Sequence, residues 1–155
     1  MTQLTEKEFR SIVNASWRKT RPIILERDGY KCVACGSKEK LEVHHILKGL
    51  TDPTGACIVE IFGITKEWLV HHLKTYNNPM NLVTLCRNCH LTLSKKYIRD
   101  KYRRKSERVI LGLSYRRKIW DEKQHYIELA IRARMKKLYG ENWGKRLQML
   151  VKEQI

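Results

Sequence analysis

Near the start of the chain, apolar side chains recur at helical spacing, just after residues that favour the amino terminus of a helix. Thr5 and Glu8 have the spacing of a capping box, in which each side chain bonds to the other residue's backbone N–H. The face that follows consists of Phe9, Ile12, Val13, Ser16 and Trp17. The pattern predicts a helix over residues 5–19 that ends before Pro22, and a short second helix over residues 22–28.

Two short strands are predicted in the middle of the chain, on either side of a segment with a looser pattern. Residues 41–46 alternate between apolar and polar side chains, and residues 82–85 form a compact, largely apolar run. A helix is expected to begin after Cys89 and to continue to about Tyr97. The order is therefore strand, strand, helix, with an insert over about residues 48–78 between the strands.

Three more amphipathic helices are predicted, one in the insert and two near the carboxyl terminus. The first begins at Thr65 as N-cap and ends at the Asn77-Asn78-Pro79 segment. Its packed side carries Trp68, Leu69, His72, Leu73 and Tyr76. The second is long, ends at Gly140, which suits a helix C′ position, and is marked by Trp120, Ile127, Ile131, Arg134 and Leu138. The third is marked by Trp143, Leu147, Leu150 and Val151.

Composition and charge narrow the class of protein. The chain has 155 residues, 42% of them hydrophobic and 31% charged, which is typical of a folded domain with room for an appended helical lobe. A net charge of +16 disfavours a compact fold by self-repulsion, and proteins with such a charge usually bind a polyanion. We therefore expect a nucleic-acid partner rather than a basic surface that only keeps the protein soluble. We expect no membrane association, because no apolar run spans a bilayer and the amino terminus lacks a signal-peptide core.

Four of the five cysteines form two CxxC pairs, Cys32 with Cys35 and Cys86 with Cys89. A tight knuckle lets both sulfurs of such a pair approach one ion at about 2.3 Å, and four thiolates suit a closed tetrahedral Zn²⁺ site. Disulfides or reduced core cysteines are the alternatives, but a chain without an export signal is expected in a reducing compartment, where paired CxxC motifs favour metal. Cys57 is expected to be a small buried hydrophobe.

Histidines and an asparagine are interleaved with the cysteine pairs in a fixed order. The His44-His45 pair lies on the first predicted strand, Asn81 precedes the second, and His90 directly follows the second CxxC. The segments that carry the pattern are RDGYKCVACG at 27–36, LEVHHI at 41–46 and NLVTLCRNCH at 81–90. Over about residues 20–98 the chain resembles the HNH endonucleases that have a zinc-stapled ββα-metal core.

The resemblance implies a role for each of these polar residues. His44 and His90 would ligate a catalytic divalent cation (Mg²⁺, Mn²⁺, Ni²⁺ or Zn²⁺), and His45 would be the general base that deprotonates the attacking water. Adjacent residues on a strand point to opposite faces, so the two histidines cannot do the same job. An imidazole suits a base because its ordinary pKa of about 6.5 lies close to neutral pH. Asn81 would either brace the loop that carries the base or reach the metal.

The chain departs from the family pattern in two ways. Many members have an acidic residue where His44 stands, and two imidazoles without a carboxylate would make a softer site that accepts Mn, Ni, Co or Zn at least as well as Mg. The insert is also longer than in minimal members, and it contains a second pair, His71-His72. That pair falls on a predicted helix rather than a strand, so we expect it to be structural or to contact DNA.

Most of the positive charge lies beyond Ser94, where Lys and Arg outnumber Asp and Glu by 19 to 7. Each phosphate that a basic side chain neutralises releases counterions, so DNA affinity should fall steeply with salt. Such contacts would position a duplex without reading its sequence. The predicted DNA-binding residues are Lys95, Lys96, Arg99, Arg103, Arg104, Arg116, Arg117, Lys118, Arg132, Arg134 and Lys136.

Together these features predict an α+β protein with an N-terminal helix and an HNH ββα-metal core in residues 1–98, and a basic helical DNA-binding extension in residues 99–155. The expected activity is metal-dependent hydrolysis of phosphodiester bonds in double-stranded DNA, by nicking or, with a homodimer, by cutting both strands. The alternatives are a non-catalytic zinc-binding nucleic-acid-binding module and an accessory nuclease that works with a phage packaging protein. Small nucleases of this kind resemble those of phages, mobile elements or restriction systems, which implies the cytoplasm of a bacterial or phage-infected cell.

Overall fold

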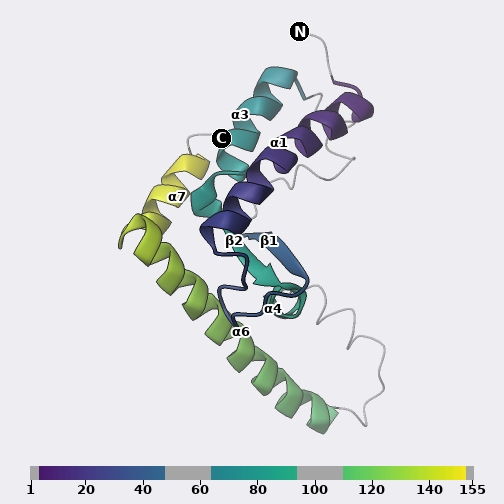
Figure 1. Cartoon of the computed structure of the whole chain (residues 1–155). Helices are drawn as coiled ribbons and strands as arrows, with labels where there is room; N and C mark the ends of the chain where they lie inside the picture. Colours follow the sequence, from purple (N-terminus) through teal and green to yellow (C-terminus); the bar gives the residue numbers. More distant parts are fainter. Residues whose placement is uncertain (1–3, 48–63, 94–109, 153–155) are drawn as a thin grey trace.

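A small two-stranded sheet lies between helices in the computed structural model, which describes residues 4–47, 64–93 and 110–152, with the backbone alone for 110–120 and 151 (Figure 1). This mixture of helices and one small sheet agrees with the predicted α+β class. In the described part of the chain, no helix is both long and apolar enough to cross a membrane. The predictions for Cys57 and for most of the insert lie outside the described residues.

Helix α1 (Glu6–Arg27) is longer than predicted, because it continues through Pro22. Its amino terminus has the predicted capping box: Thr5 Oγ1 accepts from the Glu8 N–H at 3.3 Å, and Glu8 Oε2 accepts from the Thr5 N–H at 2.9 Å. The predicted break before Pro22 is wrong. A proline removes one helical hydrogen bond and crowds the preceding turn, but Ile24 in the next turn is fully buried, and its packing stabilises the continuous helix.

The sheet is antiparallel, and every residue of β1 (Leu41–His45) pairs with one of β2 (Leu82–Cys86). Directly paired residues point to the same face of a sheet, so the register sorts the side chains into two groups. The face that packs on α1 carries Leu41, Val43, His45, Leu82 and Thr84. The opposite face carries Glu42, His44, Val83 and Leu85. The adjacent histidines therefore lie on different faces.

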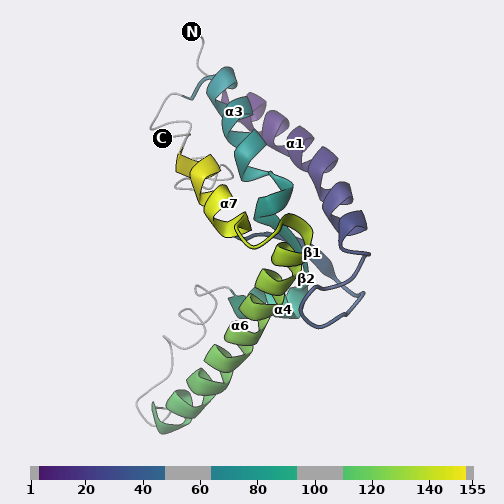
Figure 2. The same cartoon turned by 90° about the vertical axis from the view of Figure 1, so that its left-hand side faces the viewer.

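Two shorter helices flank the sheet, and both lie close to where the sequence predicts them. Helix α3 (Lys66–Tyr76) begins at the predicted N-cap, Thr65, whose side chain accepts from the Trp68 N–H at 3.2 Å. It lies beside α1 (Figure 2), and the two helices share a buried cluster of Phe9, Ile64, Leu69 and Leu73. After the 3₁₀ turn η1 (Pro79–Asn81) and β2, helix α4 (Arg87–Leu93) begins three residues earlier than expected.

The long helix α6 (Ile110–Tyr139) covers the second face of the sheet with its carboxyl-terminal half. Three buried residues at four-residue spacing pack against β2: Ile127, Ile131 and Met135. Gly140 then ends the helix as predicted, with φ of +86° and its N–H bonded to the Lys136 carbonyl at 2.8 Å. Helix α7 (Trp143–Lys152) follows, while the first turns of α6 project away from the sheet (Figures 1 and 2).

A buried carboxylate ties these elements together. Asp28, 3% exposed, follows α1 and accepts hydrogen bonds from Arg27 at 2.8 and 3.0 Å and from the Thr84 N–H of β2 at 2.9 Å. Arg27 also donates to the carbonyl oxygens of Pro79 and Leu82. Burial alone would raise the pKa of Asp28, but the hydrogen bonds and charge of Arg27 outweigh it and lower that pKa.

We predict that Asp28→Asn lowers the free energy of unfolding by about 3 kcal/mol, because it leaves the Arg27 charge without its partner. A folded-state pKa below the unfolded value near 3.8 means that Asp28 stabilises the protein above that pH. This stabilisation is lost as the pH falls through the folded-state pKa. Urea unfolding at pH 7 and pH 3 measures both effects.

The matched control is Asp121→Asn, which changes an exposed aspartate of α6. It should unfold like the wild type at both pH values. Equal stability of Asp28→Asn and Asp121→Asn at pH 7 would contradict the role assigned to Asp28.

Candidate functional site

The first cysteine pair sits in a tight knuckle before β1. The Cys32 N–H bonds to the Ser37 carbonyl and the Gly36 N–H bonds to the Cys32 carbonyl, both at 2.8 Å. Gly36 has φ of +75°, a conformation that glycine adopts without strain. The chain therefore folds back on itself within five residues, so that Cys32 and Cys35 point to one place.

The second pair meets the first at the junction of β2 and α4. Cys86 is the last residue of β2 and Cys89 lies in the first turn of α4. The four Sγ atoms lie within 4.8 Å of one another, and those of Cys35 and Cys86 are 3.6 Å apart. Four sulfurs about 2.3 Å from one ion would be separated by about 3.8 Å. All four are free thiols, so the predicted convergence of the two CxxC pairs is confirmed and the cluster fits a metal ion such as Zn²⁺.

The electrostatics of the cluster call for a cation. At Cys89, burial, a hydrogen bond between its thiol and Cys86 that holds the proton on Cys89, and the nearby charge of Cys32 raise the thiol pKa far above its ordinary range. At Cys32, burial also raises the pKa, but the backbone N–H groups around the knuckle outweigh it and lower it. Negative charge on Cys32 therefore keeps the proton on Cys89. A divalent ion removes this mutual repulsion, so all four sulfurs can ligate as thiolates.

We predict that stripping the metal lowers the melting temperature by on the order of 10 °C or more, because the ion holds the knuckle to the β2–α4 junction. Differential scanning calorimetry with and without a strong chelator measures the shift, and elemental analysis shows whether the ion has left. Cys35→Ser should reproduce the loss without chelator. An unchanged melt after the metal has demonstrably been removed would contradict a structural metal.

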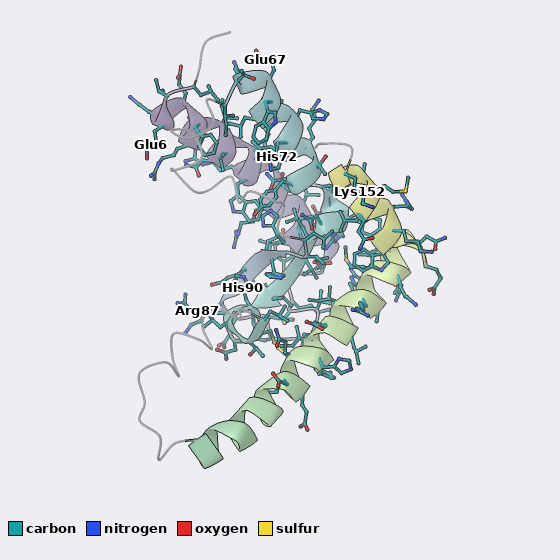
Figure 3. All side chains as sticks on the ribbon, turned by 180° about the vertical axis from the view of Figure 1, so that it is seen from behind. Glu6, Glu67, His72, Arg87, His90 and Lys152 are labelled. Atoms are coloured by element: carbon teal, nitrogen blue, oxygen red, sulfur yellow. The ribbon has the colours of Figure 1, made fainter. Side chains whose placement is uncertain are left out.

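On the α4 side of the sheet, the structure brings His44 and His90 together. Their ring centroids are 4.9 Å apart and the rings meet edge to face. A carboxylate that the sequence analysis missed joins them: Glu42 Oε2 hydrogen bonds to His90 Nδ1, and Glu42 Oε1 lies 3.7 Å from Arg87 Nη1. Arg87 and His90 project from the same short helix (Figure 3). The signal available in the sequence was the spacing of Glu42 and His44, two residues apart on a strand.

These three residues are neighbours rather than a closed ligand set. Among the residues that the structure describes, only the four cysteines form a group whose ligand atoms all lie within 4.8 Å of one another. The side chains of Glu42, His44 and His90 are all half-buried. The sequence analysis expects two imidazoles without a carboxylate, but the structure places the Glu42 carboxylate beside them.

His45 lies on the other face of β1, in a pocket of aromatic rings. It stacks on Tyr76 at 3.9 Å and on Trp17 at 5.3 Å between ring centroids. Its Nε2 lies 3.1 Å from Asn77 Oδ1, and the Asn77 amide nitrogen donates to Ser16 Oγ at 2.9 Å. In this arrangement the amide oxygen of Asn77 accepts, which favours the tautomer of His45 with the proton on Nε2.

Asn81 braces the chain immediately after the histidine pair. It is 2% exposed, and its Oδ1 accepts from the Leu47 N–H at 2.7 Å. Its amide nitrogen donates to the carbonyl oxygens of Leu47 at 3.0 Å and Tyr76 at 2.9 Å. Both ends of the amide are engaged with backbone groups. Of the two roles that the sequence leaves open, this geometry supports bracing and not metal binding.

We predict that Asn81→Ala lowers the free energy of unfolding by about 2–4 kcal/mol, since it leaves buried backbone groups of Leu47 and Tyr76 without their partner. Amide hydrogen exchange at Leu47 should accelerate by the corresponding factor. Asn88→Ala, at an exposed position of α4, is the control and should change neither quantity. Wild-type stability of Asn81→Ala together with weaker metal binding would instead indicate the metal-binding role.

The second histidine pair lies on α3, as predicted, and its two members differ. His71 is exposed. His72, labelled on α3 in Figure 3, is half-buried. Its ring stacks on Trp68 at 4.8 Å and on Tyr76 at 6.0 Å between centroids. Because Tyr76 also stacks on His45, near-parallel rings form a column from α3 to α1. The expected packing of His72 with Trp68 and Tyr76 is confirmed.

The predicted DNA-binding residues fall into four groups. Lys95, Lys96, Arg99, Arg103 and Arg104 lie outside the described residues, and Arg116, Arg117 and Lys118 lie where only the backbone of α6 is described. Arg132 and Lys136 are exposed on α6, although Lys136 pairs with Glu141 at 2.7 Å. Arg134 instead points inward: it donates to the Arg27 carbonyl at 2.6 Å and lies 3.4 Å from Asp28 Oδ1.

The guanidinium of Arg134 joins α6 to the end of α1 through its Nε and Nη2 atoms. The sequence could not reveal this, because Arg134 lies more than a hundred positions from Arg27. The assignment of Arg134 as a phosphate contact stays a prediction.

Comparison with protein-family models, with curated proteins and with solved structures gives no match for this chain. The resemblance to the HNH endonucleases therefore stays a prediction from the sequence motifs.

Proposed function

We propose that the chain is a metal-dependent DNA endonuclease of the HNH type, which hydrolyses phosphodiester bonds. One observation carries the proposal: on a strand–strand–helix unit fastened by four cysteines, His44 of β1 and His90 of α4 lie in ring contact. In the sequence, these two residues lie in separate segments that are connected only by the order of the motifs. The net charge of +16 supports a polyanionic substrate.

In this proposal His44 and His90 hold a divalent ion beside the Glu42 carboxylate; their ring contact and the Glu42–His90 hydrogen bond support it. When bound, such an ion supplies Lewis-acid stabilisation of the charge that develops on the scissile phosphate. Imidazole nitrogens favour Ni²⁺ or Zn²⁺, and the nearby carboxylate also suits Mn²⁺ or Mg²⁺.

In this proposal His45 takes the proton from the attacking water. Asn77 holds the proton on Nε2, so Nδ1 is the atom that accepts. His45 is the last residue of β1, and His44 faces the other side of the strand. The scissile phosphodiester must therefore lie across the carboxyl end of β1 to reach both.

A second candidate function is a zinc-stapled nucleic-acid-binding module without catalytic activity. The observation that favours it is the packing of His45 between Trp17 and Tyr76, with its Nε2 bonded to Asn77, because aromatic packing is also a common structural role for histidine. In that case His44 and His90 would bind an ion without cutting.

The deciding experiment incubates the zinc-loaded full chain with supercoiled plasmid and either Mg²⁺ or Mn²⁺. We predict that the wild type produces open circles and that His45→Ala cuts at least about 100-fold more slowly, with DNA binding retained in a gel-shift assay. His71→Ala, at an exposed histidine of α3, is the control and should cut at the wild-type rate.

The remaining outcomes separate the two candidates. Cutting by His45→Ala at the wild-type rate would show that the base assignment is wrong. Tight DNA binding by a wild type that cuts with neither metal would favour the non-catalytic module.

A further inference from the structure

We infer that Glu42 is a positioning residue for the metal centre of the proposed function: it fixes His90 in the tautomer that presents Nε2 to the ion. This inference rests on the proposed function, because it assigns a ligand atom within the same centre. It adds to that centre a residue whose side chain holds one ligand without itself being required to touch the substrate.

The contact between Glu42 and His90 determines the tautomer. An ionised carboxylate only accepts hydrogen bonds, so the Nδ1 atom of His90 that meets Glu42 Oε2 must carry the proton. The lone pair is then on Nε2. Metal-ligating histidines generally donate their other ring N–H to a carboxylate or a carbonyl, which also sets the orientation of the ring. The Glu42–His90 pair has this arrangement.

The surrounding residues hold the carboxylate in place. Glu42 and His44 are two residues apart on β1, so both point to the face where the His90 ring meets His44. The second carboxylate oxygen faces Arg87, which lies three residues before His90 on α4. Glu42 thus bridges two positions of α4, and this bridge orients the helix that carries His90.

The simpler reading is that Glu42 forms a surface ion pair and nothing more. Its side chain is 36% exposed, and ion pairs at such positions contribute little to stability. An ion pair of that kind predicts no effect of Glu42 on metal affinity. The two readings therefore differ in a measurable quantity other than stability.

The test is isothermal titration of Mn²⁺ into the zinc-loaded full chain, since Mn²⁺ competes poorly for the thiolates of the cysteine cluster. We expect Glu42→Gln to weaken Mn²⁺ binding by about 10- to 100-fold, because glutamine carries no charge and can either accept from or donate to Nδ1. Glu39→Gln, which removes the same charge from an exposed position in the same segment, should stay within about twofold of the wild type.

A second readout does not depend on bound Mn²⁺. Nitrogen-15 NMR of the imidazole rings in the zinc-loaded protein, above pH 8, should show His90 protonated on Nδ1 in the wild type and on a mixture of both nitrogens in Glu42→Gln. Calorimetric melting of each variant checks that the fold is retained.

Each outcome has one meaning. Wild-type Mn²⁺ affinity in Glu42→Gln, or a wild-type His90 protonated on Nε2, would overturn the inference and leave the proposed function standing. A wild type that binds no Mn²⁺ and cuts no plasmid would overturn the metal centre itself, and the inference with it. If Glu39→Gln weakened Mn²⁺ binding as much as Glu42→Gln, the loss of affinity would come from net charge alone, and this too would overturn the inference.

Discussion

The meeting of four thiols at one point is the constraint on which the rest of the site depends. Cys35 and Cys86 are 51 positions apart, yet their sulfur atoms lie 3.6 Å from each other. Because Cys86 ends β2 and Cys89 lies in the first turn of α4, holding these sulfurs fixes the angle at which α4 leaves the sheet. That angle decides whether His90 reaches His44. The cysteine cluster therefore controls the relative position of the two histidines, although the two sets share no atom.

A second constraint joins the carboxyl-terminal helices to the same core. Asp28 accepts from Arg27 and Arg134, so two of the basic residues stabilise the fold. Ile131 and its neighbours on α6 pack against β2. The basic extension expected from the sequence is thus part of the core along its second half. Arg132 on the same half of α6 is exposed.

The two-residue period of a strand divides the histidine pair between two environments. His44 faces a polar setting with Glu42 and His90, where a cation is favourable. His45 faces aromatic rings and the Asn77 amide, which hold its orientation. Asn81 holds the chain just after the pair through hydrogen bonds to the backbone of Leu47 and Tyr76. The rigidity of this strand end comes from the residues around it.

The sequence by itself determined the local features: the capping box at Thr5, the two strands, the CxxC knuckle, the stop at Gly140 and the order of the candidate ligands. These follow from backbone preferences and from periods of 2 and 3.6 residues, which act over a few neighbouring positions. Only the tertiary structure decided what each face meets. Helix α1 continues through Pro22, and Arg134 donates to the Arg27 carbonyl. Asn81 accepts from the Leu47 N–H, and Glu42 hydrogen bonds to His90. Each of these outcomes depends on packing between distant segments, and no local pattern contains that information.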